Sequence, residues 1–194
     1  MARTADPARR AELIDAIIDE LARTGIASFS LRTLATALGR STRVLTHHFA
    51  DKDALLAAVL ARLDEQQHEA LAATPGWADP AVGIGTIVAD AWRRHLSAAE
   101  LPRTRLVQEI EGLAAAGRLT GHVPAFVSGR AEFVATALEL RGLAPHDALR
   151  KATLLNNSYA GLQADFLTTG DATRTEAALA MLCDLADTWP QPMH

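Results

Sequence analysis

The sequence predicts an all-α protein, and three observations support this. Alanine and leucine, which lose little side-chain freedom in a helix, recur throughout the 194 residues. Apolar residues recur at intervals of three and four, as on helices with one buried face. No stretch alternates apolar and polar residues for long enough to indicate a strand. We expect about nine helices, divided between an amino-terminal domain over residues 1–51 and a larger helical domain over residues 52–194.

Glycines and short polar side chains divide the first part of the chain into four helices. Gly25 and Gly39 are suited to end the first two, because glycine adopts the left-handed conformation at low cost. Ser30, Ser41 and Asp51 are suited to begin the next three, because their oxygens can accept from unpaired backbone N–H groups. The short third helix is expected to bury Val44, Leu45 and Phe49.

Five further helices are expected after the loop at residues 72–80. Their apolar stripes fall within 84–96, 106–113, 123–138, 155–166 and 178–189. Pro145 is suited to the first turn of the eighth helix, and the segment 168–173 is expected to be a loop. No apolar run is long enough for a transmembrane helix, and the single cysteine excludes an internal disulfide. We therefore expect a cytoplasmic protein.

Charge is distributed unevenly along the chain. The net charge is −4, which by itself argues against nucleic-acid binding. Residues 1–62 nevertheless carry 9 Lys and Arg against 7 Asp and Glu, whereas residues 63–194 carry 10 against 16. A basic segment on an acidic chain is typical of a protein that binds a polyanion, although a solvated face could produce the same cluster by chance.

The second and third helices have the spacing of a helix-turn-helix. Ala35, Gly39 and Leu45 provide a small residue for close helix crossing, a glycine for the turn and an apolar residue that packs the second helix on the first. Such a unit places its second helix in the major groove of DNA, where arginine can pair with guanine and hydroxyls can bond bases or phosphates.

The stretch "SLRTLATALGRSTRVLTHHFADKDALLAAVL" resembles the DNA-binding domain of the tetracycline-repressor (TetR) family, and the resemblance covers roughly residues 8–62. The chain departs from that family at Thr46, where a tyrosine is usual, and at Arg40 and Arg43, where smaller or apolar residues are usual. The resemblance and the helical spacing together predict DNA contacts from Arg32, Thr33, Arg40, Ser41, Thr42, Arg43, Thr46, His47, His48 and Lys52.

No pattern predicts a metal site, a cofactor or a catalytic site. His47 and His48 are adjacent on a helix and point in different directions, so they cannot easily share an ion. Glu109 and Glu111 are two apart and do not converge as an acid–base pair would. The other histidines, apart from His95, are expected at the surface: His68, His122, His146 and His194.

Polar residues within the apolar stripes of the second domain are candidates for a ligand pocket. An apolar lining with a few oriented polar groups is typical of such pockets, although each residue could instead be a satisfied core residue. The candidate lining residues are Trp92, His95, Phe126, Arg130, Asn156 and Tyr159. In the family that the chain resembles, the last two helices form a dimer, and the candidate interface residues here are Leu155, Leu162, Phe166, Leu182, Leu185 and Trp189.

These features together predict a homodimeric, non-enzymatic transcriptional regulator. The expected partner is double-stranded DNA with a palindromic operator, from which an unknown small-molecule effector releases a repressor. Two alternatives remain open from the sequence alone. One is a helical ligand-binding or interaction protein without specific DNA binding, and the other is a small-molecule enzyme.

Overall fold

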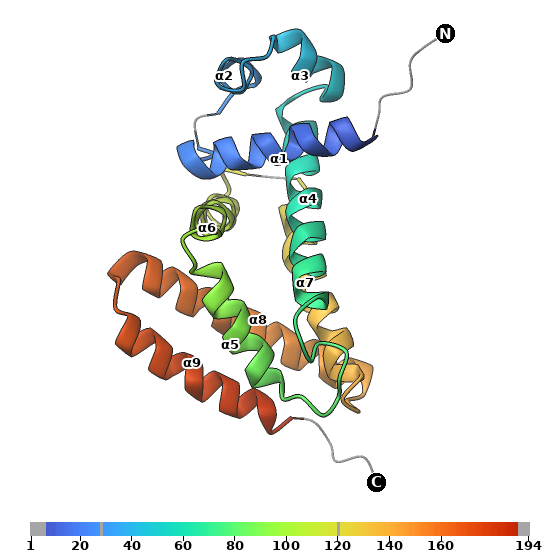
Figure 1. Ribbon diagram of the computed structural model, residues 1–194, viewed down its shortest axis with the longest axis vertical. Helices are drawn as coiled ribbons and strands as arrows, with labels where there is room; N and C mark the ends of the chain where they lie inside the picture. Colours follow the sequence, from blue (N-terminus) through green and yellow to red (C-terminus); the bar gives the residue numbers. More distant parts are fainter. Residues whose placement is uncertain (1–6, 28, 120, 190–194) are drawn as a thin grey trace. The chain divides into compact units, whose positions relative to one another are not determined.

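The computed structural model describes residues 7–27, 29–119 and 121–189, and within them the chain forms nine helices and no strands (Figure 1). The prediction of an all-α protein is confirmed. The helices are α1 (Pro7–Thr24), α2 (Leu31–Ala37), α3 (Thr42–His48), α4 (Lys52–Ala72), α5 (Ile84–His95), α6 (Leu101–Ala115), α7 (Val123–Glu139), α8 (Pro145–Thr169) and α9 (Ala172–Asp187).

The chain divides into two compact units, but not at the expected residue. Unit one comprises the chain up to Gln66 together with Ala98–Phe126, and unit two comprises Gln67–Ser97 with the chain from Val127 onward. The boundary therefore falls within α4 and within α7 rather than between residues 51 and 52. The physical reason is that the first half of α4 buries Leu55 and Val59 in the same core as α1.

Unit one is built around the apolar faces of α1, α2, α3, the first half of α4 and α6. Polar contacts tie α1 to two neighbours. Arg62 on α4 donates to both carboxylate oxygens of Asp15 at 2.8 and 2.9 Å. This hydrogen bonding holds the pKa of Asp15 below its ordinary value. Arg103 on α6 donates to Asp19 at 2.7 Å.

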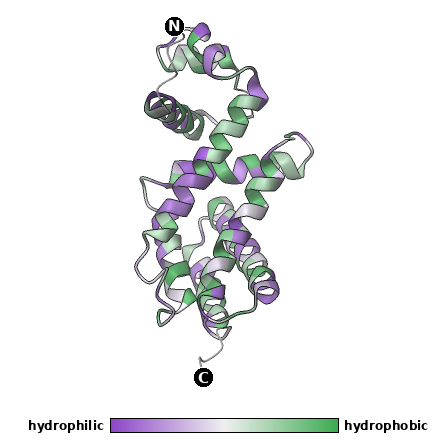
Figure 2. Ribbon diagram, turned by 90° about the vertical axis from the view of Figure 1, so that its right-hand side faces the viewer, coloured by the Kyte–Doolittle hydropathy of each residue, from purple (hydrophilic) through white to green (hydrophobic). Residues whose placement is uncertain are grey.

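The local boundary signals are mostly confirmed, with two differences. Gly25 and Gly39 have φ values of +83° and +62°, and the Asp51 carboxylate accepts from the Ala54 N–H at 2.8 Å. Ser41, in contrast, makes no capping bond through its side chain. The expectation that Val44 is buried was wrong, because it is 37% exposed, whereas Leu45 next to it is fully buried. A helix as short as α3 has room for few buried positions. Figure 2 displays the alternation of hydrophilic and hydrophobic residues along the helices.

Unit two has a second core, formed by the end of α4 with α5, α7, α8 and α9. Glycine allows α5 and α9 to approach closely. A Cβ at Gly85 would lie 2.8 Å from the Cys183 carbonyl oxygen and 2.7 Å from the Asp187 carboxylate. The Gly85 N–H donates to that carboxylate at 2.7 Å. Substitution of this glycine would therefore push α5 and α9 apart.

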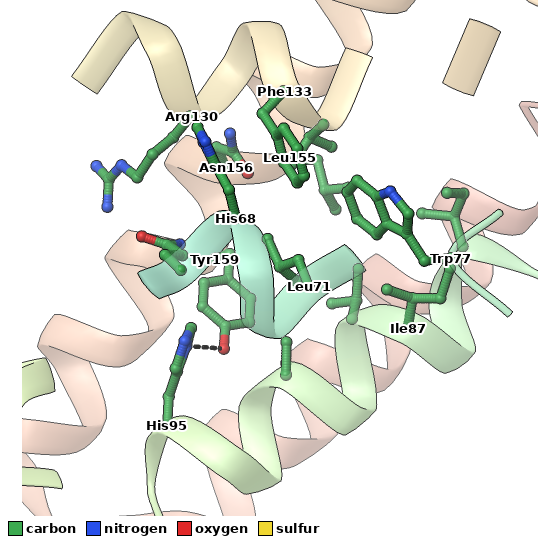
Figure 3. Close-up of a pocket in the computed structure, with 15 residues that line it drawn as sticks. His68, Leu71, Trp77, Ile87, His95, Arg130, Phe133, Leu155, Asn156 and Tyr159 are labelled. Carbon is green, nitrogen blue, oxygen red and sulfur yellow. Dashed lines mark hydrogen bonds between the residues drawn. The ribbon is translucent and has the colours of Figure 1, made fainter. Parts of the chain in front are cut away.

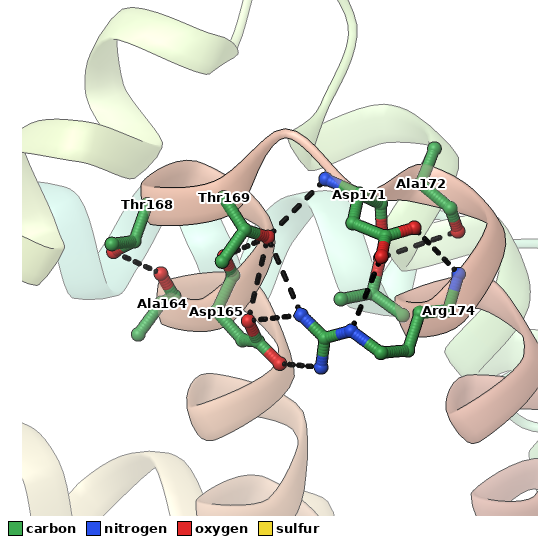
Figure 4. A network of polar contacts seen from close by, with 8 residues as sticks. Ala164, Asp165, Thr168, Thr169, Asp171, Ala172 and Arg174 are labelled. Atoms are coloured by element: carbon green, nitrogen blue, oxygen red, sulfur yellow. Dashed lines mark hydrogen bonds and ion pairs between the residues drawn. The ribbon is translucent and has the colours of Figure 1, made fainter.

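The turn between α8 and α9 is shorter than the expected loop at 168–173, because α8 continues to Thr169 and α9 begins at Ala172. Gly170 ends α8 with a φ of +70°, and Asp171 caps α9 by accepting from the Arg174 N–H at 3.0 Å. Arg174 also donates to both oxygens of Asp165 at 2.6 and 2.7 Å (Figure 4). This bidentate pair spans the turn.

A buried arginine organises the loop between α4 and α5. Arg141 is 2% exposed, and its guanidinium donates to five backbone carbonyls. Four of these belong to the loop, at Gly76, Trp77, Asp79 and Val82, and burial lowers the pKa of Arg141. No sequence pattern predicted this role. Among the described residues, no helix is long and apolar enough to cross a membrane.

Candidate nucleic-acid interface and ligand pocket

The start of α2 is fixed by a reciprocal cap. The Ser30 hydroxyl accepts from the Thr33 N–H at 3.1 Å, and the Thr33 hydroxyl accepts from the Ser30 N–H at 2.9 Å. Each side chain thereby satisfies a backbone donor that the helix leaves unpaired. Thr33, which was expected to contact DNA, is exposed, but its hydroxyl takes part in this cap.

The turn between α2 and α3 uses the left-handed conformation of Gly39. Backbone N–H groups of Gly39 and Arg40 donate to the carbonyls of Thr36 and Ala35, at 3.1 and 2.8 Å, and close the end of α2. Leu34, Ala35 and Leu45 are buried together in the core of unit one. The predicted helix-turn-helix is therefore present, with its small residue, glycine and apolar residue in the expected places.

The outer face of α3 carries the polar side chains. Thr42, Arg43, Thr46 and His47 are all exposed. The Thr46 hydroxyl donates to the Thr42 carbonyl at 3.1 Å, which leaves its oxygen free to accept. His48 is half-buried and so presents less surface than the other four.

Lys52 begins α4 beside a buried aromatic ring. Its side chain is exposed, with Nζ 4.3 Å from the centroid of the Phe29 ring. A cation over a ring face is held there by electrostatic attraction. The ammonium group is thereby positioned at the amino end of α4, where backbone N–H groups favour an anion.

Glu109 on α6 holds the loop that leads into α2. Its carboxylate accepts from the N–H of Ile26 at 3.0 and 3.1 Å and from the N–H of Ala27 at 3.0 Å. The sequence pattern predicted no role for Glu109, because it does not converge with Glu111 as an acid–base pair would. The structure gives it a role, because it connects α6 to the helix-turn-helix within unit one.

The structure places the ten predicted DNA-contact residues on and around α2 and α3. Within the described part of the chain, none of the cations Arg32, Arg40, Arg43 and Lys52 pairs with a carboxylate. The exposed members of the predicted set are Arg32, Thr33, Arg40, Ser41, Thr42, Arg43, Thr46, His47 and Lys52.

A pocket lies within unit two (Figure 3). Its lining comes from the end of α4, the following loop, α5, α7 and α8. The apolar lining residues are Leu71, Trp77, Ile84, Ile87, Val88, Ala91, Phe133, Val134 and Leu155, and the polar ones are Gln67, His68, His95, Arg130, Asn156 and Tyr159.

A hydrogen-bonded pair joins α5 to α8 at the pocket wall. The Nδ1 atom of His95 lies 2.9 Å from the Tyr159 hydroxyl and 3.3 Å from Gln163 Nε2. Burial, together with the charges of Arg94 and Arg130, lowers the pKa of His95 to about 4. Burial raises the pKa of Tyr159. Both groups are neutral near pH 7, and a neutral His95 with its proton on Nε2 can accept from the Tyr159 hydroxyl at Nδ1.

Aromatic stacking forms another part of the wall. Phe133 stacks with His68, with centroids 3.9 Å apart, and with Trp77, with centroids 4.9 Å apart. The expectation that His68 lies at the surface is corrected, because it is half-buried against Phe133 and lines the pocket. In the sequence, the position of His68 on the inner side of α4 could have indicated this. His122 and His146 are exposed as expected, and His194 lies outside the described residues.

Four of the six predicted pocket residues line this pocket: His95, Arg130, Asn156 and Tyr159. The other two do not. Trp92 lies in the core of unit two with its ring edge-on to Tyr159, and Phe126 lies in the core of unit one. The stripe on α7 was expected to be one continuous face, but it is shared between the two units.

The predicted dimer residues fall into two groups. Leu155, Leu182 and Trp189 are 3–8% exposed, so they belong to the core of their own protomer and offer little area to a partner. Leu162 and Phe166 are half-buried, and Leu185 is 46% exposed. The other large apolar side chains exposed on α8 and α9 are Leu149, Leu154 and Met181.

Residues 13–59 match the family model of "Bacterial regulatory proteins, tetR family". Two similar curated proteins are HTH-type transcriptional regulators named BetI. The one from Paraburkholderia phytofirmans is 42% identical over 52 residues, which are 27% of each chain. The one from Klebsiella pneumoniae is 34% identical over 65 residues, which are 34% of this chain and 33% of the relative. The chain thus matches about a quarter to a third of these relatives' length.

Two solved structures from Rhodococcus share the fold over nearly the whole chain. One, a transcriptional regulator, has a TM-score of 0.70 and 21% identity over 91% of this chain and 95% of its own. The other, described as a TetR-family transcriptional regulator, has a TM-score of 0.74 and 18% identity over 96% and 100%. At these identities the likeness establishes the fold. Over residues 13–59, which include the helix-turn-helix, this chain is similar to the tetR family of bacterial regulatory proteins.

Proposed function

We propose that this protein is a sequence-specific, DNA-binding transcriptional regulator that responds to a small molecule. The observation that carries the proposal is the exposed helix-turn-helix with four cations that have no internal carboxylate partner among the described residues. Cations not neutralised within the protein are available to phosphates, and their binding releases counterions from DNA. The relatives that match this region are themselves named transcriptional regulators.

We assign different tasks to the cations. Arg43 is on the outer face of α3, where a guanidinium can pair with O6 and N7 of guanine in the major groove. Arg40, in the turn, and Lys52, at the start of α4, are suited to phosphates, which position the protein without reading sequence. Arg32, on α2, can meet a phosphate at the edge of the groove.

The protein acts as a homodimer in this proposal, since one helix-turn-helix touches few base pairs. Two copies related by a two-fold axis read a palindrome with half-sites roughly 34–36 Å apart, or a multiple of this distance. The apolar side chains exposed on α8 and α9 support these helices as the contact between copies. Leu185 of the predicted set is retained, and Leu154 and Met181 replace its buried members.

The small molecule binds in the pocket of unit two and weakens DNA binding, as a repressor requires. Helix α4 supplies Lys52 and core residues to unit one and His68 and Leu71 to the pocket, so it is the covalent route between the two sites. A ligand that prefers one of two states of the dimer by about 1–3 kcal/mol would change DNA affinity roughly 5–150-fold.

Selection of DNA from a random library by the full-length protein tests this proposal. Selected sequences should contain an inverted repeat, and binding measured by fluorescence anisotropy should weaken steeply as salt is raised from about 50 to 200 mM. The pocket alone would equally suit a ligand-binding protein that never touches DNA. A protein that enriches no sequence at low salt supports that alternative and rules out our proposal.

A further inference from the structure

The charged and polar groups of the unit-two pocket are all neutral or positive. The lining includes Arg130 and no aspartate or glutamate. Arg94 lies next to His95 on α5, and its Nη1 atom donates to the Ala70 carbonyl and to the Thr74 hydroxyl at 3.2 Å each. The positive charges of Arg94 and Arg130 both act electrostatically on His95, since both lower its pKa. The lining therefore presents one side chain with a formal positive charge and none with a formal negative charge.

The pocket also contains a hydrogen-bond donor that is not satisfied within the protein. The Nδ2 atom of Asn156 is buried and has no partner among the described residues. A buried donor without an acceptor carries the desolvation cost of its N–H groups. An acceptor atom on a bound ligand would remove this cost, whereas a second donor would not.

Two polar groups of the lining lie apart from two of its apolar groups. Figure 3 separates Arg130 and His95, at one side, from Trp77 and Ile87 at the other. The stack of Phe133 with His68 and Trp77 adds aromatic rings to the lining. An occupant that fits this division has one acceptor-rich end and one apolar body.

We propose that the effector pocket binds a small carboxylic acid with a flat, aromatic body. Its carboxylate would accept from Arg130 and Asn156, and its body would lie against Phe133 and Trp77. A guanidinium can donate two parallel bonds to a carboxylate, and a single arginine balances its one negative charge. This inference rests on the proposed ligand response, and it specifies the class of ligand.

The aromatic rings raise a competing class, since they could also hold an organic cation by cation–π attraction. The charges of the pocket disfavour that class. A cation would face Arg130 with no carboxylate in the lining to balance it, and it would leave the Asn156 N–H groups without an acceptor.

Calorimetric titration of the full-length protein at pH 7 with three matched probes tests the proposal. The probes are 3-phenylpropionate, its neutral amide 3-phenylpropanamide, and the cation phenethyltrimethylammonium. We expect the carboxylate to bind at least about tenfold more tightly than the amide and the cation, the size of one charge-assisted hydrogen bond. A cation that binds as tightly as the carboxylate, or no binding of the carboxylate, overturns the proposal.

Variants of Arg130 and Asn156 test whether these two residues cause the preference for the carboxylate. Arg130→Met should lower the affinity for the carboxylate about tenfold or more and change that for the amide less than about twofold. The matched control is Arg150→Met, an exposed arginine on α8, which should alter neither affinity. Asn156→Asp, of nearly the same shape, should reverse the preference from the carboxylate to the cation. An Asn156→Asp protein that keeps the carboxylate preference overturns the assignment, even if Arg130→Met fails to fold.

DNA binding is measured separately, so that the two proposals fail in distinguishable ways. Binding of the carboxylate without a change in DNA affinity supports the ligand class and counts against the ligand response. If the protein binds specific DNA but takes up only the cation, the proposal of a DNA-binding regulator stands and the proposed ligand class is overturned.

Discussion

The helix-turn-helix and the pocket place their polar groups in opposite ways. On α2, α3 and the start of α4, the cations lie outside and have no carboxylate partner in the described residues. In unit two, Arg141 is buried among backbone carbonyls, and His95 bonds Tyr159 across the pocket wall. From this comparison we expect that the first region can lose polar side chains with little loss of stability, whereas Arg141 and His95 in the second contribute to stability.

The inner face of α3 should give the largest effect on stability, because it lies within the core. Leu45 is fully buried, and its neighbour Val44 is 37% exposed. Leu45→Ala should lower the free energy of unfolding by about 2–5 kcal/mol, through lost burial and the cavity left behind. Val44→Ala, the matched control, should cost about 0.5 kcal/mol. Urea unfolding measures both, and equal losses would contradict the assignment of inner and outer faces.

Substitution of Arg141 tests whether a polar side chain in unit two stabilises the fold. Arg141→Met removes five donated hydrogen bonds and leaves carbonyls of the 76–82 loop to find other donors. We expect a loss of about 3 kcal/mol in the free energy of unfolding, given that hydrogen bonds to charged groups are among the stronger ones. The exposed Arg43→Met is the control and should change stability by less than about 0.5 kcal/mol. An Arg141→Met protein of unchanged stability would contradict this difference between the two regions.

His95 adds a pH dependence to the stability of the protein. Its pKa falls from 6.5 to about 4 on folding, so between these pH values the unfolded chain binds a proton that the folded chain does not. The free energy of unfolding should therefore decrease as pH drops from 6.5 towards 4, by up to about 3 kcal/mol. His95→Gln should remove this component in urea titrations across that range, and His122→Gln should leave it intact. An unchanged pH profile in His95→Gln would exclude His95 as the source.

Lys52 should have the smallest effect, because we assign it a single phosphate contact. Lys52→Ala should weaken binding to all DNA sequences alike and reduce the slope of log affinity against log salt by about 1. The loss of its contact with Phe29 should cost less than about 1 kcal/mol of stability. Anisotropy titrations against specific and scrambled duplexes at several salt concentrations measure this. A loss confined to one sequence would mean that Lys52 reads bases.

The two regions also differ in how far the sequence predicts them. The helix-turn-helix is assembled from consecutive residues, so Ser30, Ala35, Gly39 and Leu45 together define it. The pocket draws on residues from 67 to 159, and the predicted residues that line it are polar residues in otherwise apolar stripes, such as His95 and Asn156. Periodicity identifies the buried face of a helix but not the neighbour it packs against. For the same reason, the division of α7 between two cores and the role of Arg141 could not be predicted.

The central claim, that the outer face of α3 reads DNA sequence, is tested most directly by substituting one arginine. The measurement is the affinity of Arg43→Ala for the selected inverted repeat, for that repeat with the contacted guanines replaced, and for a scrambled duplex. Arg118→Ala, an exposed arginine in unit one outside the helix-turn-helix, is the control. Our account predicts that Arg43→Ala loses roughly tenfold or more on the selected site and stops distinguishing the replaced guanines. An equal loss on all three duplexes, or no loss beyond that of Arg118→Ala, would contradict it.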